Sequence, residues 1–202
     1  MLLARAESPA DLDRLTAEES AVVALVDRAA AGGDPAAFGE LYDLFVDRVY
    51  RYLYFRTGQH AEAEDLTEQV FLKAWQAIGR YRWQGRPFLA WLYRLAHNVH
   101  IDHVRKQRPT TSLTDDDHPI DVPSDIAAGQ LAQRLDADLI ARALIQLTAE
   151  QQRVIVLKFI EGLDNDQIAR IMDKREGAIR ALQMRALLSL RRVLEAQGEG
   201  HR

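Results

Sequence analysis

Apolar side chains recur every three or four residues along most of this 202-residue chain, which is the spacing of one face of an α-helix. Between residues 36 and 56, for example, Phe38, Leu41, Tyr42 and Phe45 follow this spacing. No segment shows the sustained alternation of apolar and polar residues that indicates a β-strand. The periodicity therefore predicts an all-α protein.

The same periodicity divides the chain into two small helical domains. In the first, Thr57-Gly58 suits the end of one helix and Pro87 the first turn of another. In the second, Thr148-Ala-Glu-Gln151 and Asp164-Asn-Asp-Gln167 are capping patterns that open helices. The interval between the domains is rich in Pro, Thr and Asp and has no sustained period. The expected order is an N-terminal tail (1–19), a helical domain (20–107), an acidic flexible linker (108–134), a second helical domain (135–196) and a C-terminal tail (197–202).

Charge is segregated along the chain, although the whole protein has a formal net charge of only −4. Residues 80–108 contain seven Arg/Lys and one acid, and residues 174–192 contain six Arg/Lys and one acid. Residues 109–138, between these blocks, contain seven Asp and one Arg. Two basic blocks separated by an acidic one predict two anion-binding surfaces.

Composition and motifs argue against several classes of protein. The chain has no Cys, which excludes disulfides and thiolate chemistry. No run approaches the roughly 18 apolar residues of a membrane helix, and the N-terminus lacks a signal peptide's apolar run, so we expect a cytoplasmic protein without membrane insertion. Neither a G-x-x-x-x-G-K-[ST] loop nor a G-x-S-x-G motif occurs. We expect no enzymatic activity and no cofactor.

The stretch "DQIARIMDKREGAIRALQMRAL" has the pattern of a helix-turn-helix, because a short helix and a three-residue turn precede a longer basic helix. Such a second helix fits a DNA major groove about 12 Å wide. The alternative is a helical bundle with a solvated basic face. We expect a packed face formed by Ile168, Ala169, Ile171, Ile179, Leu182 and Ala186. The candidate contacts to duplex DNA are Lys174, Arg175, Glu176, Arg180, Ala181, Met184 and Arg185.

Residues 80–87, "RYRWQGRP", interleave arginines with aromatic rings between two helices. Exposed rings beside Arg are typical of single-stranded DNA sites, where stacking contributes about 1–3 kcal/mol per base. In the alternative, Trp83 folds back as a lid on the core. In the helix that follows, Phe88, Trp91, Leu92 and Leu95 are expected in the core. The candidate contacts to an opened strand and its phosphates are Arg80, Tyr81, Arg82, Trp83, Arg86, Arg94, Asn98, Arg105 and Lys106.

Two other groups of polar residues also invite a functional interpretation. His97, His100 and His103 repeat at a spacing of three, but about 600° of helical rotation separates the first from the last. No other His or Cys completes a ligand set, so we expect no metal site. The acidic face of residues 62–68 is either a solvated helix surface or a docking site for a basic partner.

Taken in order, these segments resemble the extracytoplasmic-function (group IV) sigma factors of the sigma-70 family. The resemblance covers roughly residues 22–195 and is carried by "AEDLTEQVFLKAW", "WLYRLAHNVHIDHVR", the acidic linker and "KREGAIRALQMRAL". The last of these, together with the "WQGRPF" loop, is most similar to the branch that contains the developmental factor BldN. The resemblance implies a promoter-specificity subunit that makes no bonds itself.

The resemblance also implies a role and a partner for each segment. Region 2, about residues 36–108, would recognise and melt the −10 element and hold the opened non-template strand. Region 4, about residues 135–195, would read the duplex −35 element through its last helix. The expected partners are core RNA polymerase (its clamp and flap), promoter DNA and an anti-sigma factor. The residues expected to face the polymerase clamp are Glu64, Asp65, Glu68, Gln69 and Lys73.

One departure from the family pattern concerns the last helix. Many relatives carry G-T-V-K-S-R-L-x-R-A there, whereas this chain places its leucine one position early, at Leu182, followed by Gln183. The shift rotates the expected buried stripe by about 100° and leaves the choice of base-contacting residues open. Two other hypotheses also remain open at this point. One is a stand-alone helix-turn-helix regulator that binds a palindrome as a dimer, and the other is a helical adaptor that binds only protein.

Overall fold

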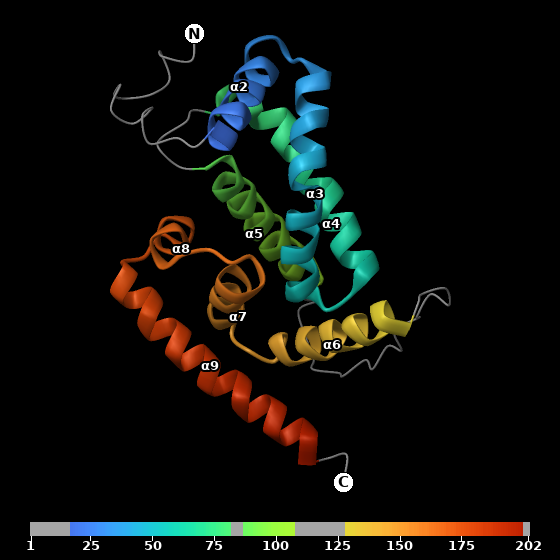
Figure 1. The fold of residues 1–202 in the computed structure, drawn as a ribbon, viewed down its shortest axis with the longest axis vertical. Helices are drawn as coiled ribbons and strands as arrows, with labels where there is room; N and C mark the ends of the chain where they lie inside the picture. The colour runs from blue at the N-terminus through green and yellow to red at the C-terminus, as the bar shows by residue number, and fades with distance from the viewer. Residues whose placement is uncertain (1–16, 82–86, 108–127, 200–202) are drawn as a thin grey trace.

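The computed structural model describes residues 17–81, 87–107 and 128–199, and every regular element in these ranges is a helix (Figure 1). The predicted all-α class is therefore confirmed. The first group of helices comprises α2 (Ala17–Gly32), α3 (Pro35–Thr57), α4 (His60–Ala77), the 3-10 turn η2 (Ile78–Arg80) and α5 (Phe88–Gln107). The second comprises α6 (Ala128–Leu144), α7 (Ala149–Ile155), the π-helical turn η3 (Val156–Ile160), α8 (Asn165–Met172) and α9 (Glu176–Glu199).

Local sequence signals set the ends of α3. One oxygen of Asp34 accepts hydrogen bonds from the N–H groups of Ala36 (3.0 Å) and Ala37 (3.2 Å), which have no partner within the helix. These bonds, with Arg28 nearby, lower the pKa of Asp34. At the other end Gly58 adopts φ 73° and its N–H donates to the carbonyl of Tyr54. The predicted stop at Thr57-Gly58 is confirmed.

Both predicted capping boxes are present in the second group. Thr148 and Gln151 exchange side-chain-to-backbone hydrogen bonds of 3.4 and 3.3 Å at the start of α7. Asp164 and Gln167 do the same at 2.7 and 3.0 Å at the start of α8. These four bonds satisfy N–H groups that the first turn of a helix leaves unpaired, so both helices begin where the pattern predicts.

Two boundaries differ from expectation. Pro87 precedes α5 instead of lying in its first turn, and its carbonyl accepts a hydrogen bond from the N–H of Ala90 (2.9 Å). Helix α6 begins at Ala128, inside the segment expected to be linker. Residues 108–127, which hold most of that segment, lie outside the described residues.

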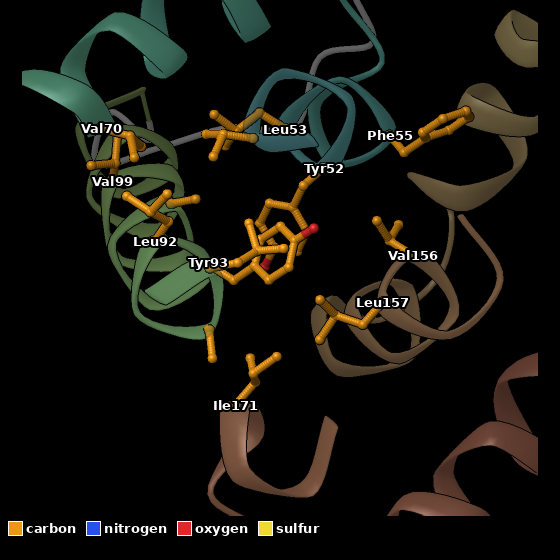
Figure 2. Close-up of a cluster of buried hydrophobic side chains, with 14 of the residues drawn as sticks. Tyr52, Leu53, Phe55, Val70, Leu92, Tyr93, Val99, Val156, Leu157 and Ile171 are labelled. Carbon is orange, nitrogen blue, oxygen red and sulfur yellow. The ribbon is translucent and has the colours of Figure 1, made fainter. Parts of the chain in front are cut away.

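The two groups of helices share one hydrophobic core (Figure 2). At its centre the rings of Tyr52 and Tyr93, from α3 and α5, lie 5.1 Å apart between centroids. From the second group, Val156, Leu157 and Ile171 are buried in the same cluster. Helix α8 packs on α5, and η3 and α6 pack on α3. The sequence predicted two domains, and in this structure they are packed against each other.

Candidate nucleic-acid interface

Helices α8 and α9 form the helix-turn-helix predicted from the sequence. In the turn, Asp173 adopts φ 55° and its N–H donates to the carbonyl of Ala169, which ends α8. The two helices pack on each other. The whole predicted packing face is buried: Ile168, Ala169, Ile171, Ile179, Leu182 and Ala186.

The opposite face of α9 is exposed and predominantly basic. Arg180 forms an ion pair with Glu176 one turn earlier, and both side chains remain open to solvent. Lys174 is half-buried, with its Nζ 3.0 Å from a carboxylate oxygen of Glu150. The other predicted duplex contacts are exposed: Arg175, Glu176, Arg180, Ala181, Met184 and Arg185.

The early leucine of α9 is accommodated by a hydrogen bond that the sequence did not predict. Leu182 is 7% exposed and lies in the core. Gln183 is half-buried, and its Nε2 donates to Oδ1 of Asn165 in the first turn of α8 (2.9 Å). The core therefore takes Leu182, while Gln183 joins the two helices at the rim of their contact.

Truncating these two neighbours should have different effects on stability. We expect Leu182→Ala to lower the free energy of unfolding by about 2–5 kcal/mol, because it leaves a cavity in the core. Gln183→Ala removes one hydrogen bond at a partly wet rim and should cost about 1 kcal/mol. Urea unfolding of the two variants measures the difference. Equal losses, or a larger loss for Gln183→Ala, would mean that the buried stripe is placed wrongly.

The second predicted DNA surface, on α5 and the segment before it, is only partly open to solvent. Arg80, Asn98, Arg105 and Lys106 are exposed as expected. Arg94 is half-buried, and its Nη2 donates to the carbonyl of Arg170 in α8 (3.1 Å). Its guanidinium is thus engaged by the second group of helices instead of being directed freely to solvent.

Of the two aromatic residues in the segment 80–87, Tyr81 lies within the described residues and Trp83 does not. Tyr81 was expected to be exposed, but it is half-buried, with its ring centroid 5.4 Å from that of Phe88 and 5.0 Å from that of Trp91. Burial raises the pKa of Tyr81 to about 12. Trp91 packs against the core as predicted. Arg82, Trp83 and Arg86 lie outside the described residues.

Helix α4 presents the acidic face predicted to dock a partner. Its opposite face, which includes Leu66 and Val70, is fully buried. The Nζ of Lys73 lies 3.8 Å from a carboxylate oxygen of Asp102 in α5. Leu72, which the sequence analysis missed, is 58% exposed in the same helix and adds an apolar contact surface. The five predicted residues are all exposed: Glu64, Asp65, Glu68, Gln69 and Lys73.

The three histidines of α5 have separate environments. His103 lies 2.7 Å from a carboxylate oxygen of Glu62. His100 is buried, with Nδ1 3.4 Å from a guanidinium nitrogen of Arg56. His97 lines a cleft of about 360 Å³ between α5 and the second group of helices. Within the described residues, no cluster of three His, Cys, Asp or Glu side chains is placed to hold a metal ion.

Acidification should destabilise the fold through two of these histidines. Burial, with Arg153 and Arg56 nearby, lowers the pKa of His97 to about 3, and burial with Arg56 lowers that of His100 to about 4. Both values lie below the unfolded value near 6.5. In this pH range the unfolded chain therefore binds protons that the folded chain does not bind. The free energy of unfolding falls as the pH falls from about 6.5 toward 4.

Thermal unfolding between pH 7.5 and 5 measures this loss. The loss in free energy of unfolding approaches about 1.4 kcal/mol per pH unit for a fully buried histidine. We expect the double variant His97→Gln/His100→Gln to show a shallower dependence on pH than the wild type over this interval. A dependence as steep as that of the wild type would contradict the assignment.

Together, these features define a helical DNA-binding protein with a helix-turn-helix in its second half and a basic surface on α5 in its first. A third exposed face, on α4, carries the carboxylates of Glu64, Asp65 and Glu68. Among the described helices, none is long and apolar enough to cross a membrane.

Comparison with known proteins identifies the family of this DNA-binding protein. Residues 41–110 match sigma-70 region 2, and residues 137–190 match sigma-70 region 4. The chain is 40% identical over 182 residues to the ECF RNA polymerase sigma factor BldN of Streptomyces coelicolor, covering 88% of this chain and 67% of that protein. It is 32% identical over 169 residues to the factor SigL of Mycobacterium tuberculosis H37Rv, covering 84% of this chain and 95% of the relative.

A solved structure agrees with these matches. CnrH, in complex with the cytosolic domain of CnrY, superposes with a TM-score of 0.63 at 26% identity, covering 87% of this chain and 98% of CnrH. The chain therefore belongs to the extracytoplasmic-function RNA polymerase sigma factors of the sigma-70 family, which are non-catalytic subunits that direct promoter recognition. The expected similarity to BldN is also confirmed.

Proposed function

We propose that this chain reads a −35 element with α9 and a −10 element with α5 and residues 80–87, and so selects promoters for core RNA polymerase. The observation that carries the proposal is the exposed basic face of α9, opposite a stripe that is fully packed. Arginines on a recognition helix donate two hydrogen bonds to a guanine edge in the major groove. Arg180 and Arg185 are the residues proposed to do so.

The −10 element would be held by the exposed polar residues of α5. Arg105 and Lys106 suit the phosphates of an opened strand, and Asn98 suits a base edge or a phosphate. Arg94 joins them once it leaves the carbonyl of Arg170. The sequence of residues 82–86 adds Arg82, Trp83 and Arg86, of which Trp83 is proposed to stack on a flipped base.

The polymerase clamp would bind the exposed face of α4. Supporting this, the carboxylates of Glu64, Asp65 and Glu68 lie on the solvent side of a helix whose other side is packed. Leu72 supplies apolar area beside them. An apolar side chain with charged residues around it matches the apolar centre and polar rim of a protein interface.

A protein inhibitor, an anti-sigma factor, is the remaining proposed partner. CnrH has a similar fold and was solved bound to the cytosolic domain of another protein. Because RNA polymerase transcribes in the cytoplasm, we place this chain there as well.

Binding to core polymerase is the most direct test of the proposed function. The purified full-length chain, immobilised, should retain core polymerase at micromolar concentration, and the resulting complex should give run-off transcripts from promoters that core polymerase alone does not use. Absence of retention at micromolar protein would overturn the proposal.

A further inference from the structure

The cleft of about 360 Å³ beside His97 has side chains of α5, α7 and the end of α8 in its walls. Its polar lining consists of Arg94, His97, Asn98, Arg153 and Asp173. The buried side chains of Ile171 and Met172 form an apolar wall. The cleft thus places two guanidiniums beside an apolar surface, and its volume lies at the lower end of the range for sites that hold small ligands.

Arg153 is the most buried charged residue of this cleft, with an exposed fraction of 8%. Its Nη2 donates to the carbonyl of Ile171 (3.1 Å), whereas its Nε has no hydrogen-bond partner among the described residues. A buried arginine is rarely left without a counter-charge, because burial removes water from the guanidinium. The wall of the cleft therefore holds a cation that this part of the chain does not neutralise.

A second buried arginine adds positive charge to the same region. Arg56 is 3% exposed, and burial together with the nearby charge of Arg153 lowers its pKa. Its guanidinium donates to the carbonyl of Ala149 (3.3 Å) and lies 3.4 Å from Nδ1 of His100. Within the described ranges, Nε of Arg56 and Nδ1 of His97 are also buried without a hydrogen-bond partner. Neither arginine bonds to a carboxylate in the part of the chain that the structure describes.

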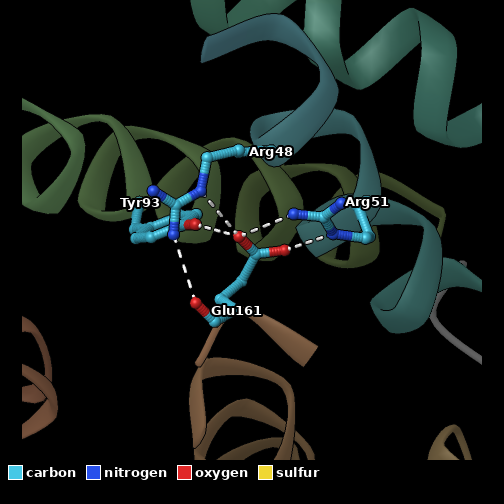
Figure 3. A network of polar contacts seen from close by, with 4 residues as sticks. All are labelled: Arg48, Arg51, Tyr93 and Glu161. Carbon is cyan, nitrogen blue, oxygen red and sulfur yellow. Dashed lines mark hydrogen bonds and ion pairs between the residues drawn. The ribbon is translucent and has the colours of Figure 1, made fainter. Parts of the chain in front are cut away.

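Another pair of arginines in the same interface has a counter-charge (Figure 3). Arg48 and Arg51 of α3 converge on the buried carboxylate of Glu161, whose oxygens lie 3.1 and 2.8 Å from their Nε atoms. The chain thus supplies an acid for these two arginines. Among the described residues it supplies none for Arg56 and Arg153, so an anion from outside the chain would complete their environment.

We propose that the cleft between α5, α7 and α8 is a binding site for a small phosphate-bearing anion, held by Arg153 and Arg94. Arginine can donate two parallel hydrogen bonds to phosphate oxygens. The imidazole of His97 and the amide of Asn98 can donate to the same group. Because these donors come from different helices, a phosphate, with oxygens in several directions, suits them better than a planar carboxylate.

The central residue of this site is not part of the surfaces proposed to read DNA. Arg153 belongs to α7 and is not among the proposed DNA contacts. Arg94 and Asn98 are shared with the proposed −10 surface, so a bound anion and an opened strand would compete for them. This competition rests on the proposed function, whereas binding of the anion does not.

Calorimetric titration of the free, full-length chain with inorganic pyrophosphate tests the site. At about 0.15 M ionic strength, we expect one molecule to bind with a dissociation constant below about 1 mM, and thermal unfolding to shift to higher temperature. Arg153→Met should weaken binding by about tenfold or more, because it removes a hydrogen bond between two charged groups. Arg153→Lys keeps the charge but not the planar fork, so its affinity should fall between the two.

Arg192→Met is the matched control, because it removes the same charge from an exposed position of α9. It should bind pyrophosphate as the wild type does. Absence of saturable binding, or equal binding by Arg153→Met and the wild type, would overturn the site. Tighter binding of citrate than of pyrophosphate would overturn the assignment to phosphate. If circular dichroism shows that Arg153→Met does not fold, Arg94→Met replaces it, with the same expected result and the same contrary one.

NMR spectra recorded during the titration locate the bound anion. The imidazole signals of His97 and the methyl signal of Met172 should shift, because both residues line the cleft. The signals of His60, at the start of α4, should stay in place. Shifts at His60 without shifts at His97 would place the anion elsewhere and contradict the proposal. Neither polymerase nor DNA is present, so a failure of the chain to bind core polymerase would overturn the proposed function and leave this result intact.

Discussion

Reversing two charges on α4, Asp65→Lys with Glu68→Lys, should weaken binding to core polymerase by about 100-fold or more. Both carboxylates are exposed, and opposing like charges at an interface costs several kcal/mol, where 1.4 kcal/mol is a factor of ten. Stability should change by no more than about 0.5 kcal/mol, because neither side chain contributes to the core. Titration of immobilised core polymerase with the variant measures the loss.

Glu40→Lys with Asp43→Lys on α3 is the control for this experiment. These two acids are also exposed, and their reversal changes the net charge of the chain by the same amount. Core binding should stay near that of the wild type. If both double variants lose binding equally, general electrostatics would explain the effect, and the α4 face would not be the polymerase site.

Removing two arginines from α9, Arg180→Ala with Arg185→Ala, should reduce promoter binding by the assembled polymerase by about 100-fold or more. Each arginine that reads a base contributes about 1–3 kcal/mol. Binding to core polymerase should be retained, since the α4 face is untouched. Filter binding or footprinting on a promoter that the wild type uses measures the effect, and the salt dependence of binding should become shallower.

Arg191→Ala with Arg192→Ala provides a matched control on the same helix. Arg191 is exposed and paired with a glutamate one turn away, as Arg180 is, but it lies near the other end of α9. This variant should keep most of the binding. A loss equal to that of the Arg180/Arg185 variant would indicate that α9 acts only through its overall charge.

Much of the local structure was predictable, because each signal acts within a few residues. The Thr148 and Asp164 capping boxes and the stop at Gly58 satisfy backbone groups of neighbouring residues, whatever the rest of the chain does. The buried stripe of α9 follows from helical geometry, which also made its exposed basic face predictable. That face is the part of the candidate site that the sequence described best.

The contact between the two regions could not be predicted from the sequence. Glu161 is a lone acid just after a helix, and its donors Arg48 and Arg51 lie about 110 residues earlier. Nothing in the local pattern distinguishes these arginines from solvated ones. The partial burial of Tyr81 and Arg94 is missed for the same reason, since it depends on which helices pack together.

The early start of α6 has a different origin. The segment expected to be linker was defined by prolines and by the loss of apolar periodicity, and Ala128–Leu144 lies partly within it. Part of this helix packs on α3, and such packing stabilises helices beyond what their sequence pattern indicates. Asp138, for example, accepts a hydrogen bond from Tyr54 of α3.

Mapping transcription start sites in cells that overexpress this chain tests the central claim, selection of promoters through two elements, most directly. We predict a set of new start sites that share two upstream sequence elements at a constant spacing, and this set should shrink when the Arg180→Ala/Arg185→Ala variant is expressed instead. No new start sites, or new ones without a shared pair of elements, would contradict the account.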